Sequence, residues 1–217
     1  MFNEDFRPLN PISFFSLACD CHFQEHDPKK DLPKKFLLPS TSDLCSEESF
    51  ADVSMAWGYE GITVQVHVNQ AYDQSFYPEV SRGDSVELFF DTRDVKTSGF
   101  NTRFCHHFFI LPKAVEEHQA GELTHFRTED THELCNPKLI TVASTFKKSS
   151  YSLKIFLPVQ CLVGYDPEQF DRLGFSYRIN RFQGEPQHFS AVSQDYQIEQ
   201  QPSLWSSVRL NHENRAV

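Results

Sequence analysis

Residues 83–94 read GDSVELFFDTRD, and this stretch has the clearest strand pattern in the chain. Along it, two sets of side chains alternate: Val86, Leu88 and Phe90 in one set, and Ser85, Glu87, Phe89 and Asp91 in the other. A period of two is typical of a strand with one face in a core. Turn-forming residues flank the pattern at 83–84 and 91–94. We therefore expect a strand at 85–91, with the Glu87 carboxylate on the face away from the core, at the solvent or in a ligand groove.

Other segments repeat this alternation, and almost none has the spacing of a helix. The expected strands are 50–57, 62–68, 104–111, 140–147, 151–158, 175–179, 188–193 and 206–211. A turn at 58–61 joins the first two as a hairpin, and 148–150 joins another pair. Short strands at this spacing predict an all-β fold, an antiparallel β-sandwich of jelly-roll-like form.

The chain divides into two parts by its pattern. Residues 1–49 are irregular, with prolines at 8, 11, 28, 33 and 39, and we expect an N-terminal arm that packs on the sandwich, with a short strand near 13–21. Residues 50–217 form the sandwich domain, because no linker interrupts them up to residue 211. Within that domain, 113–137 is polar and acidic, which predicts a long excursion with some strand near 122–127.

Composition limits the classes of partner. The chain has 217 residues, 21 of them Phe, and a formal net charge of −10. An acidic protein with a pI near 5.4 lacks the basic surface that non-specific nucleic-acid binding needs. The same charge disfavours binding to an anionic membrane. We therefore expect neither nucleic acid nor membrane among its partners.

The N-terminal sequence and the cysteines indicate the compartment. MFNEDFRPLN has two early acids and no basic start, unlike a signal peptide, and the apolar run at 12–19 is too short to span a bilayer. We expect a cytoplasmic protein. Its six cysteines would then be reduced and mostly buried thiols.

The order of these segments resembles a known family. AWGYEGITVQVHV at 56–68, GDSVELFFD at 83–91, RFCHHFFILP at 103–112, YSLKIFLPVQCL at 151–162, LGFSYRIN at 173–180 and PSLWSSVRL at 202–210 are the segments concerned. Together they resemble carbohydrate-binding module family 9 and its DOMON-like relatives over residues 50–211. DTRD, RFCHHF and PSLW also resemble a group of uncharacterised bacterial proteins with the same fold.

The resemblance implies a sandwich whose concave face holds a sugar end between two tryptophans. Glu87 matches the family's acidic sugar-contacting position, and Asn180 matches the Asn of its Asn-Asp pair, with Arg181 in place of the Asp. Cys105 and His107 fall on the strand where the family offers Arg and Asn.

Both clamp tryptophans are missing. Phe76 and Tyr77 are the nearest aromatics to the first, and Tyr196 is nearest to the second, while Trp205 matches a core aromatic. These departures weaken the sugar interpretation, because stacking on flat rings supplies much of such affinity.

Parity within each strand assembles a candidate polar face. If the strands pair as the resemblance implies, one face carries Gln65, His67, Glu87, His107, Arg178 and Asn180, with Tyr77 and Tyr196 at its rim. This face is either a groove that hydrogen-bonds polyols or a carboxylate, or a solvated surface with a Glu87–Arg178 ion pair worth about 0.5 kcal/mol.

Four weaker arrangements concern metals and cofactors, and we expect none of them to be used. Cys105 and His107 could ligate a metal with His67, and so could the pair Cys19 and Cys21, but no CxxC or HxxxH spacing supports either. Asp91 and Asp94 could bind calcium, as some family members do, or cap backbone amides in a turn. Met55 is the only internal methionine and is expected on the core side, so heme ligation is disfavoured.

Catalysis finds no support in the sequence. Asp84 and Glu87 have opposite parity and make a poor acid–base pair, and no nucleophile elbow, phosphate loop or zinc-protease motif occurs. The expected function is therefore a non-catalytic binding module for a carbohydrate or another polar small ligand. The alternative is a structural or protein-interaction domain that kept the fold and lost the sugar site, with its groove filled by the arm or the 113–137 excursion.

Overall fold

The computed structural model describes residues 17–192 and 196–211. Their strands are β1 (Ala18–Phe23), β2 (Ala51–Gly58), β3 (Gly61–Val68), β4 (Ser85–Asp91), β5 (Cys105–Val115), β6 (His118–Glu122), β7 (Thr141–Phe146), β8 (Tyr151–Pro158), β9 (Arg172–Asn180), β10 (Gln187–His188) and β11 (Ser206–Asn211). The helices are short: α1 (Ser42–Cys45) and the 3-10 turns η2 (Lys34–Phe36), η3 (Val80–Arg82), η4 (Pro137–Leu139), η5 (Val159–Cys161), η6 (Ile198–Gln200) and η7 (Pro202–Leu204). The prediction of an all-β fold is confirmed.

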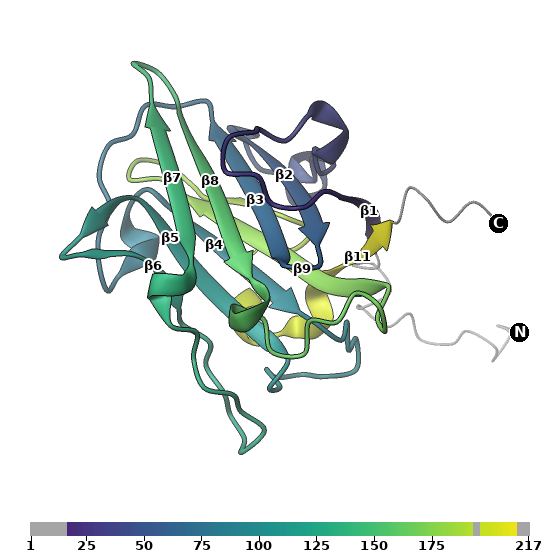
Figure 1. Ribbon diagram of the computed structural model, residues 1–217. Helices are drawn as coiled ribbons and strands as arrows, with labels where there is room; N and C mark the ends of the chain where they lie inside the picture. Colours follow the sequence, from purple (N-terminus) through teal and green to yellow (C-terminus); the bar gives the residue numbers. More distant parts are fainter. Residues whose placement is uncertain (1–16, 193–195, 212–217) are drawn as a thin grey trace, which may run out of the picture.

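The strands form one hydrogen-bonded sheet in the order β6-β5-β4-β9-β11-β1-β2-β3-β8-β7, with β10 attached to β9. This sheet folds back on itself, so that β2, β3, β8 and β7 lie in front of β9, β4 and β5 (Figure 1). The end strands approach each other, and Gln119 of β6 donates a hydrogen bond to Ser144 of β7 at 3.3 Å. The sheet is therefore barrel-like and nearly closed, and a sandwich of two separate sheets is not confirmed.

The wholly antiparallel arrangement that we predicted is wrong at β1. This strand lies between β11 and β2 and is parallel to both of them. It joins the two halves of the sheet, which explains why strand pairing runs without a break from β6 to β7. Part of the N-terminal arm is thus a member of the sheet, and the expected strand at 13–21 lies at 18–23 in the structure. Residues 1–16 are outside the described part of the chain.

The central strand β4 has the predicted orientation. It is antiparallel to β5 and β9, and Val86, Leu88 and Phe90 enter the main core between the two halves of the sheet. Glu87 and Phe89 project from the opposite, outer face. We call this outer face of β4, β5 and β9 the β4 face.

Two strand boundaries differ from the prediction for identifiable reasons. β5 continues past Pro112 to Val115, because β6 pairs with β5 only at 108–110 and at 115 and therefore leaves position 112 without a ladder partner. The expected strand at 188–193 is only the two-residue β10. Beyond it the chain enters the η6 and η7 turns, which lie over the β4 face.

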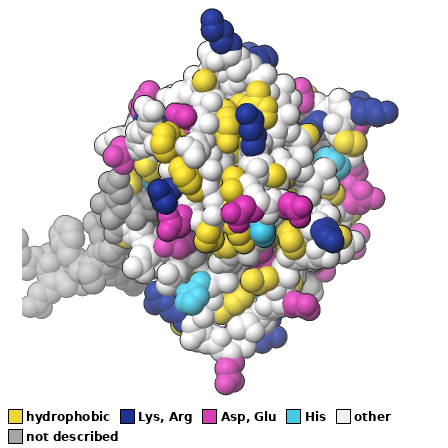
Figure 2. Space-filling view, turned by 90° about the vertical axis from the view of Figure 1, so that its left-hand side faces the viewer, with side chains coloured by type: hydrophobic (Ala, Val, Ile, Leu, Met, Phe, Trp, Pro, Cys, Tyr) yellow, Lys and Arg dark blue, Asp and Glu magenta, His cyan; other side chains and the backbone are white. Residues whose placement is uncertain are grey.

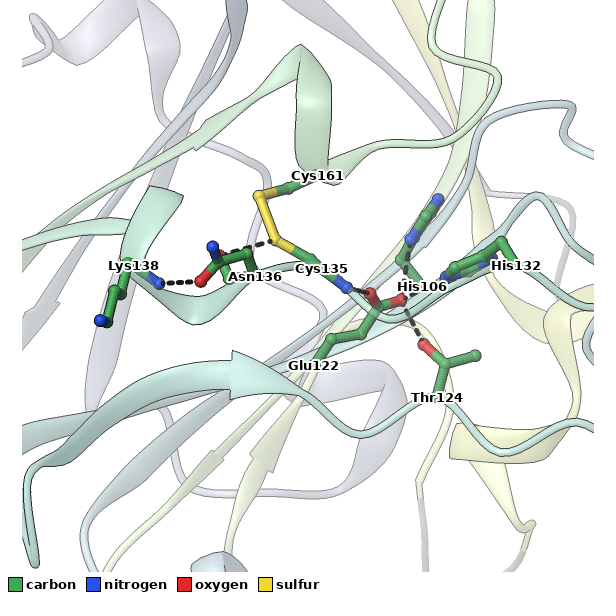
Figure 3. Close-up of a disulfide and its surroundings, with 8 residues drawn as sticks. All are labelled: His106, Glu122, Thr124, His132, Cys135, Asn136, Lys138 and Cys161. Atoms are coloured by element: carbon green, nitrogen blue, oxygen red, sulfur yellow. Dashed lines mark hydrogen bonds and ion pairs between the residues drawn. A yellow bond between two sulfur atoms is a disulfide. The ribbon is translucent and has the colours of Figure 1, made fainter.

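Cys135 and Cys161 form a disulfide, contrary to the expectation that all six cysteines are reduced. Cys19, Cys21, Cys45 and Cys105 are free thiols. The disulfide fastens the excursion after β6 to the turn after β8 (Figure 3). Among the residues described, no helix is long and apolar enough to cross a membrane.

The β2–β3 hairpin gives the first testable prediction. Gly61 has a φ of 146°, and a Cβ placed on it would collide with the backbone carbonyl of Leu157 on the neighbouring strand β8. We expect Gly61→Ala to lower the free energy of unfolding by about 2 kcal/mol, because an alanine at this φ is strained and the hairpin must move to make room for its Cβ. Chemical denaturation measures this loss. Gly99→Ala is the control, since its Cβ would meet nothing within 4 Å, and an equal loss in both variants would contradict the prediction.

Candidate functional site

A buried polar cluster occupies the middle of the β4 face. Its centre is Glu87, which is 1% exposed and has Arg178 of β9 as its register partner. His107 comes from β5, and Asn180 lies two residues beyond Arg178 on the same side of β9. The period of two along three adjacent strands therefore brings these four side chains together, as the sequence predicted. We call this group the Glu87 cluster.

Hydrogen bonds to the Glu87 carboxylate come from all three partners. Arg178 donates from Nε to Oε1 and from Nη2 to Oε2, both at 2.8 Å. Asn180 Nδ2 donates to Oε1 at 2.7 Å, and His107 Nε2 lies 2.8 Å from Oε2. A carboxylate has about four lone-pair positions, and all of them are used here. Glu87 therefore positions its neighbours and has no acceptor left for a ligand.

The electrostatics of the cluster favour the charged forms of Glu87 and Arg178. Burial raises the pKa of the Glu87 carboxyl, but hydrogen bonding and charge from His107 and the charge of Arg178 outweigh it, so its pKa lies well below the usual range. Burial lowers the pKa of Arg178, and the Glu87 carboxylate more than offsets this, so the net shift is upward. The pair is a buried, bidentate salt bridge and not the weak solvated pair that the sequence left open.

Apolar clusters border the Glu87 cluster on both sides. On one side Phe89 packs with Trp205, Ile198, Leu204 and Cys105, and Trp205 Nε1 donates to the carbonyl of Ile198 at 2.8 Å. On the other side lie Val80, Phe109 and Leu111. The segment 196–205 thus covers one part of the β4 face. The sequence had suggested the arm or the 113–137 excursion for this role.

A small cavity remains open beside the cluster. Its volume is about 180 Å³, and it is lined by Ser81, Arg178, Asn180, Arg181, Gly184 and Pro186. Arg178 reaches Glu199 at 3.8 Å. Arg181 is held by Glu48 at 2.8 Å and by the carbonyl of Glu185 at 2.9 Å. Both guanidinium groups on the cavity wall are therefore paired with carboxylates.

An exposed aromatic follows this wall in the sequence. Phe182 is 40% exposed, its ring centroid lies 5.9 Å from that of Phe76, and its backbone N–H donates to Asp84. Sequence analysis had named Phe76 and missed Phe182, Ser81 and the role of Arg181. The one available signal was that Arg181 stands in place of the Asp of the family's Asn-Asp pair.

Gln65 and His67 do not join the Glu87 cluster. Both lie on β3, which β9, β11, β1 and β2 separate from β4 in the sheet order. Gln65 accepts a hydrogen bond from the backbone of Leu32, and His67 contacts Ser152 of β8 at 2.8 Å. The alternation along a strand shows which face of the strand a residue occupies, but it does not show which strands lie next to it. The assumption that β3 lies close to β4 in the sheet was wrong.

The two predicted rim tyrosines lie at opposite sides of the β4 face. Tyr77 stacks on His118 at 4.0 Å and contacts Phe109. Tyr196 packs against the cluster around Phe89 and Trp205. Neither lines the cavity, so a role for them in binding stays a prediction.

The structure also shows where residues of the weaker metal and cofactor arrangements lie. His67 is remote from Cys105 and His107, which removes that ligand set. Asp91 accepts hydrogen bonds from the backbone of Arg93 and Val95, the turn chemistry that was the alternative to calcium. Met55 is buried in the main core.

A second buried polar group was missed altogether. His106, Glu122 and His132 bring ligand atoms within 4.8 Å of one another. His106 follows β5 parity and points away from His107, and His132 comes from an irregular excursion, so no sequence spacing linked the three.

The face of the molecule in Figure 2 carries hydrophobic, acidic, basic and histidine side chains intermixed, without one dominant type.

Comparisons with known proteins identify the fold. A carbohydrate-binding module family 9 structure from Caldicellulosiruptor kristjanssonii in complex with cellotriose has a TM-score of 0.61 and 13% identity, covering 93% of this chain and 98% of that chain. A family 9 structure from the same organism in complex with glucose has a TM-score of 0.61 and 10% identity, covering 93% and 99%. No protein-family model and no curated protein matches the chain. The fold is that of family 9, as the sequence resemblance implied.

Proposed function

We propose that this protein is a non-catalytic binding module that recognises a neutral, hydroxyl-rich ligand such as a carbohydrate beside the Glu87 cluster. The observation that carries this proposal is the cavity of about 180 Å³ walled by Arg178 and Asn180. Glu87 fixes both of these side chains through short hydrogen bonds. Both Asn180 Nδ2 protons are used, on Ser85 and Glu87, so the wall offers the Arg178 guanidinium as a donor and the Asn180 carbonyl oxygen as an acceptor. A polar wall whose groups are already oriented binds a ligand without the entropic cost of ordering them.

The size and charge of the cavity favour this class of ligand. Its volume lies below the range of about 300–1,000 Å³ typical of sites for drug-sized molecules, which suits one sugar ring or the end of a chain. Glu87 and Glu48 neutralise the two guanidinium groups on the wall. An anionic ligand would therefore gain little, and a polyol is the better match. The family 9 structures with cellotriose and glucose are in accord with this choice.

The exposed ring of Phe182 directly follows Arg181 of the cavity wall in the sequence, and we propose that it offers a stacking surface at the cavity's edge in place of the missing clamp tryptophans. We expect Phe182→Ala to weaken saccharide binding about tenfold, because an aromatic contact contributes about 0.5–1.5 kcal/mol beyond its buried area. Binding is measured by isothermal titration calorimetry with saccharides chosen by NMR screening of mono- and disaccharides.

Phe100→Ala is the matched control for this experiment. Phe100 is 39% exposed, against 40% for Phe182, and it lies in the loop between β4 and β5, whereas Phe182 directly follows Arg181 of the cavity wall. Equal affinity in the two variants would exclude Phe182 from the site. A panel in which no saccharide binds would reject the carbohydrate assignment itself.

Protein interaction is the second candidate function, favoured by one observation. The apolar contacts of Trp205, Leu204 and Ile198 fill the β4 face on the Phe89 side of the Glu87 cluster, which leaves little room for an extended glycan. In this case the exposed Phe182 would contact a protein partner, and Phe182→Ala would abolish a stoichiometric complex with little effect on stability. The cytoplasmic location, the DOMON-like kinship and the absence of nucleic-acid and membrane partners stay predictions.

A further inference from the structure

The second buried polar group joins three ligating side chains from separate elements. His106 lies on β5, Glu122 ends β6, and His132 belongs to the loop that follows (Figure 3). The side chains of His106, Glu122 and His132 are 0%, 0% and 5% exposed. Glu122 Oε1 lies 2.9 Å from His106 Nδ1 and 2.8 Å from His132 Nε2. Three titratable groups thus converge on one oxygen away from solvent.

The remaining ring nitrogens of both histidines also face oxygen acceptors. His132 Nδ1 lies 2.7 Å from the carbonyl of Arg103, and His106 Nε2 lies 3.4 Å from the carbonyl of Val163. A carbonyl can only accept, so each of these nitrogens must carry the N–H. A neutral imidazole has a single N–H. The neutral tautomers that satisfy the two carbonyls therefore leave His106 Nδ1 and His132 Nε2 as lone pairs directed at the Glu122 carboxylate.

Lone pairs that face a carboxylate oxygen repel it unless a cation lies between them. We propose that His106 Nδ1, His132 Nε2 and a Glu122 oxygen bind a divalent transition-metal ion of the zinc class. Imidazole and carboxylate ligands together suit zinc, cobalt(II) and nickel(II), whereas calcium and magnesium prefer oxygen ligands alone.

The surroundings match the outer sphere of a metal site. Metal-bound histidines donate their second N–H to a backbone carbonyl or a carboxylate, as the contacts with Arg103 and Val163 allow. The carboxylate is held as well, by Thr124 Oγ1 at 2.6 Å from Oε1 and by the Cys135 N–H at 2.7 Å from Oε2. In a tetrahedral zinc site neighbouring ligand atoms lie about 3.3 Å apart. Movements of about 0.5 Å would open the present 2.8–2.9 Å contacts to that spacing, and the two histidine nitrogens, which lie within 4.8 Å of each other, would move closer together.

The role of this metal would be structural. The ligands are buried, so a substrate does not reach the ion. The fourth position would be filled by water or by the second Glu122 oxygen, and metal binding of this kind contributes folding energy. The ion would fasten the loop after β6 to β5, next to the Cys135–Cys161 disulfide that fastens the same loop to η5. His106 and His107 are adjacent on β5 and point to opposite faces, so this site is separate from the Glu87 cluster and from the proposed ligand cavity.

The competing explanation is that both imidazoles are protonated and no metal binds. The test uses the full chain, stripped with a chelator and titrated with Zn²⁺ or Co²⁺. We expect one ion per chain, and at a free Zn²⁺ concentration 100 times the Kd a rise in Tm of about 5–10 °C. The Co²⁺ form should show the visible d–d bands of a four-coordinate nitrogen and oxygen site.

Single substitutions test whether the ion binds at His106, Glu122 and His132. His132→Gln should weaken metal binding at least about 100-fold, and it changes a loop residue, which limits the risk of misfolding. His125→Gln is the matched control, because His125 is an exposed histidine of the same loop. Cys19→Ser controls for binding at the Cys19–Cys21 pair, and both controls should retain one ion. Substoichiometric metal in the wild-type chain, or equal affinity in His132→Gln and His125→Gln, would overturn the proposal.

Discussion

Replacement of Glu87 with alanine is expected to lower the free energy of unfolding by about 3–5 kcal/mol. Glu87 is the acceptor for Arg178, His107 and Asn180, and Arg178 is itself largely buried. Removal of the carboxylate leaves a largely buried guanidinium without its bidentate partner. Urea denaturation with a fixed m-value measures the loss. Glu79→Ala, which breaks an exposed pair with Arg82, should cost no more than about 0.5 kcal/mol.

The same variant has a defined pH dependence. The folded-state pKa of Glu87 is lowered, so its contribution to stability is fully present above the ordinary carboxyl range and is lost as the pH falls through the folded value. The difference in unfolding free energy between wild type and Glu87→Ala should therefore be constant at neutral pH and shrink in acid. A difference that grows as the pH falls would contradict the ionised, paired state of Glu87.

A double substitution separates stability from recognition. In Glu87→Leu with Arg178→Met, both charges are replaced by apolar side chains, and such replacements of buried pairs are often neutral or stabilising. We expect the double variant to recover most of the stability lost in Glu87→Ala and still to lose the oriented donors of the cavity wall. Recovery of stability together with intact saccharide binding would exclude the cluster from the binding site.

The sequence predicted the local part of this arrangement well. Alternation in 85–91 placed Val86, Leu88 and Phe90 in the core and Glu87 on the opposite face, because the side-chain direction in a strand depends only on position within it. Arg178 and Asn180 followed from the same rule on β9. The prediction that Gln65 and His67 lie beside Glu87 was wrong. The order of strands in a sheet is set by contacts between distant segments, and a period-two pattern contains no information about those contacts.

Burial of Glu87 was beyond the reach of the sequence for a related reason. A carboxylate in mid-strand normally lies in solvent or in a groove. It can be buried only where other strands supply enough hydrogen-bond donors and an apolar segment covers it. The donors lie 20 residues away for His107 and 91 for Arg178, and the cover comes from residues 196–205. The cluster of His106, Glu122 and His132 was equally hidden, because Glu122 and His132 belong to the excursion at 113–137, whose path relative to β5 the sequence did not predict.

The cover over the β4 face gives the second large prediction, through Trp205. This side chain is fully buried, lies 5.8 Å from the Phe89 ring and donates to the Ile198 carbonyl. Trp205→Ala should lower the free energy of unfolding by about 3–5 kcal/mol, as is usual for large core aromatics. Trp205→Phe should cost less, because it keeps most of the packing and loses the hydrogen bond.

Thiol labelling distinguishes a cover from an ordinary core residue. Cys105 is buried in the same cluster as Trp205, and burial, together with the charge of Asp91, raises the pKa of its thiol to about 12. In Trp205→Ala the loosened segment should expose Cys105, and its labelling rate, followed by peptide mass spectrometry, should rise at least about tenfold relative to the control.

Trp57→Ala is the matched control for that experiment, because Trp57 is equally buried but belongs to the main core on β2. Its loss should destabilise the protein to a similar extent and leave the β4 face closed. Labelling of Cys105 that rises equally in both variants would mean that the thiol reacts only through global unfolding. In that case residues 196–205 would be an integral part of the core and not a separable cover, and the β4 face would have no wider opening to offer to a glycan.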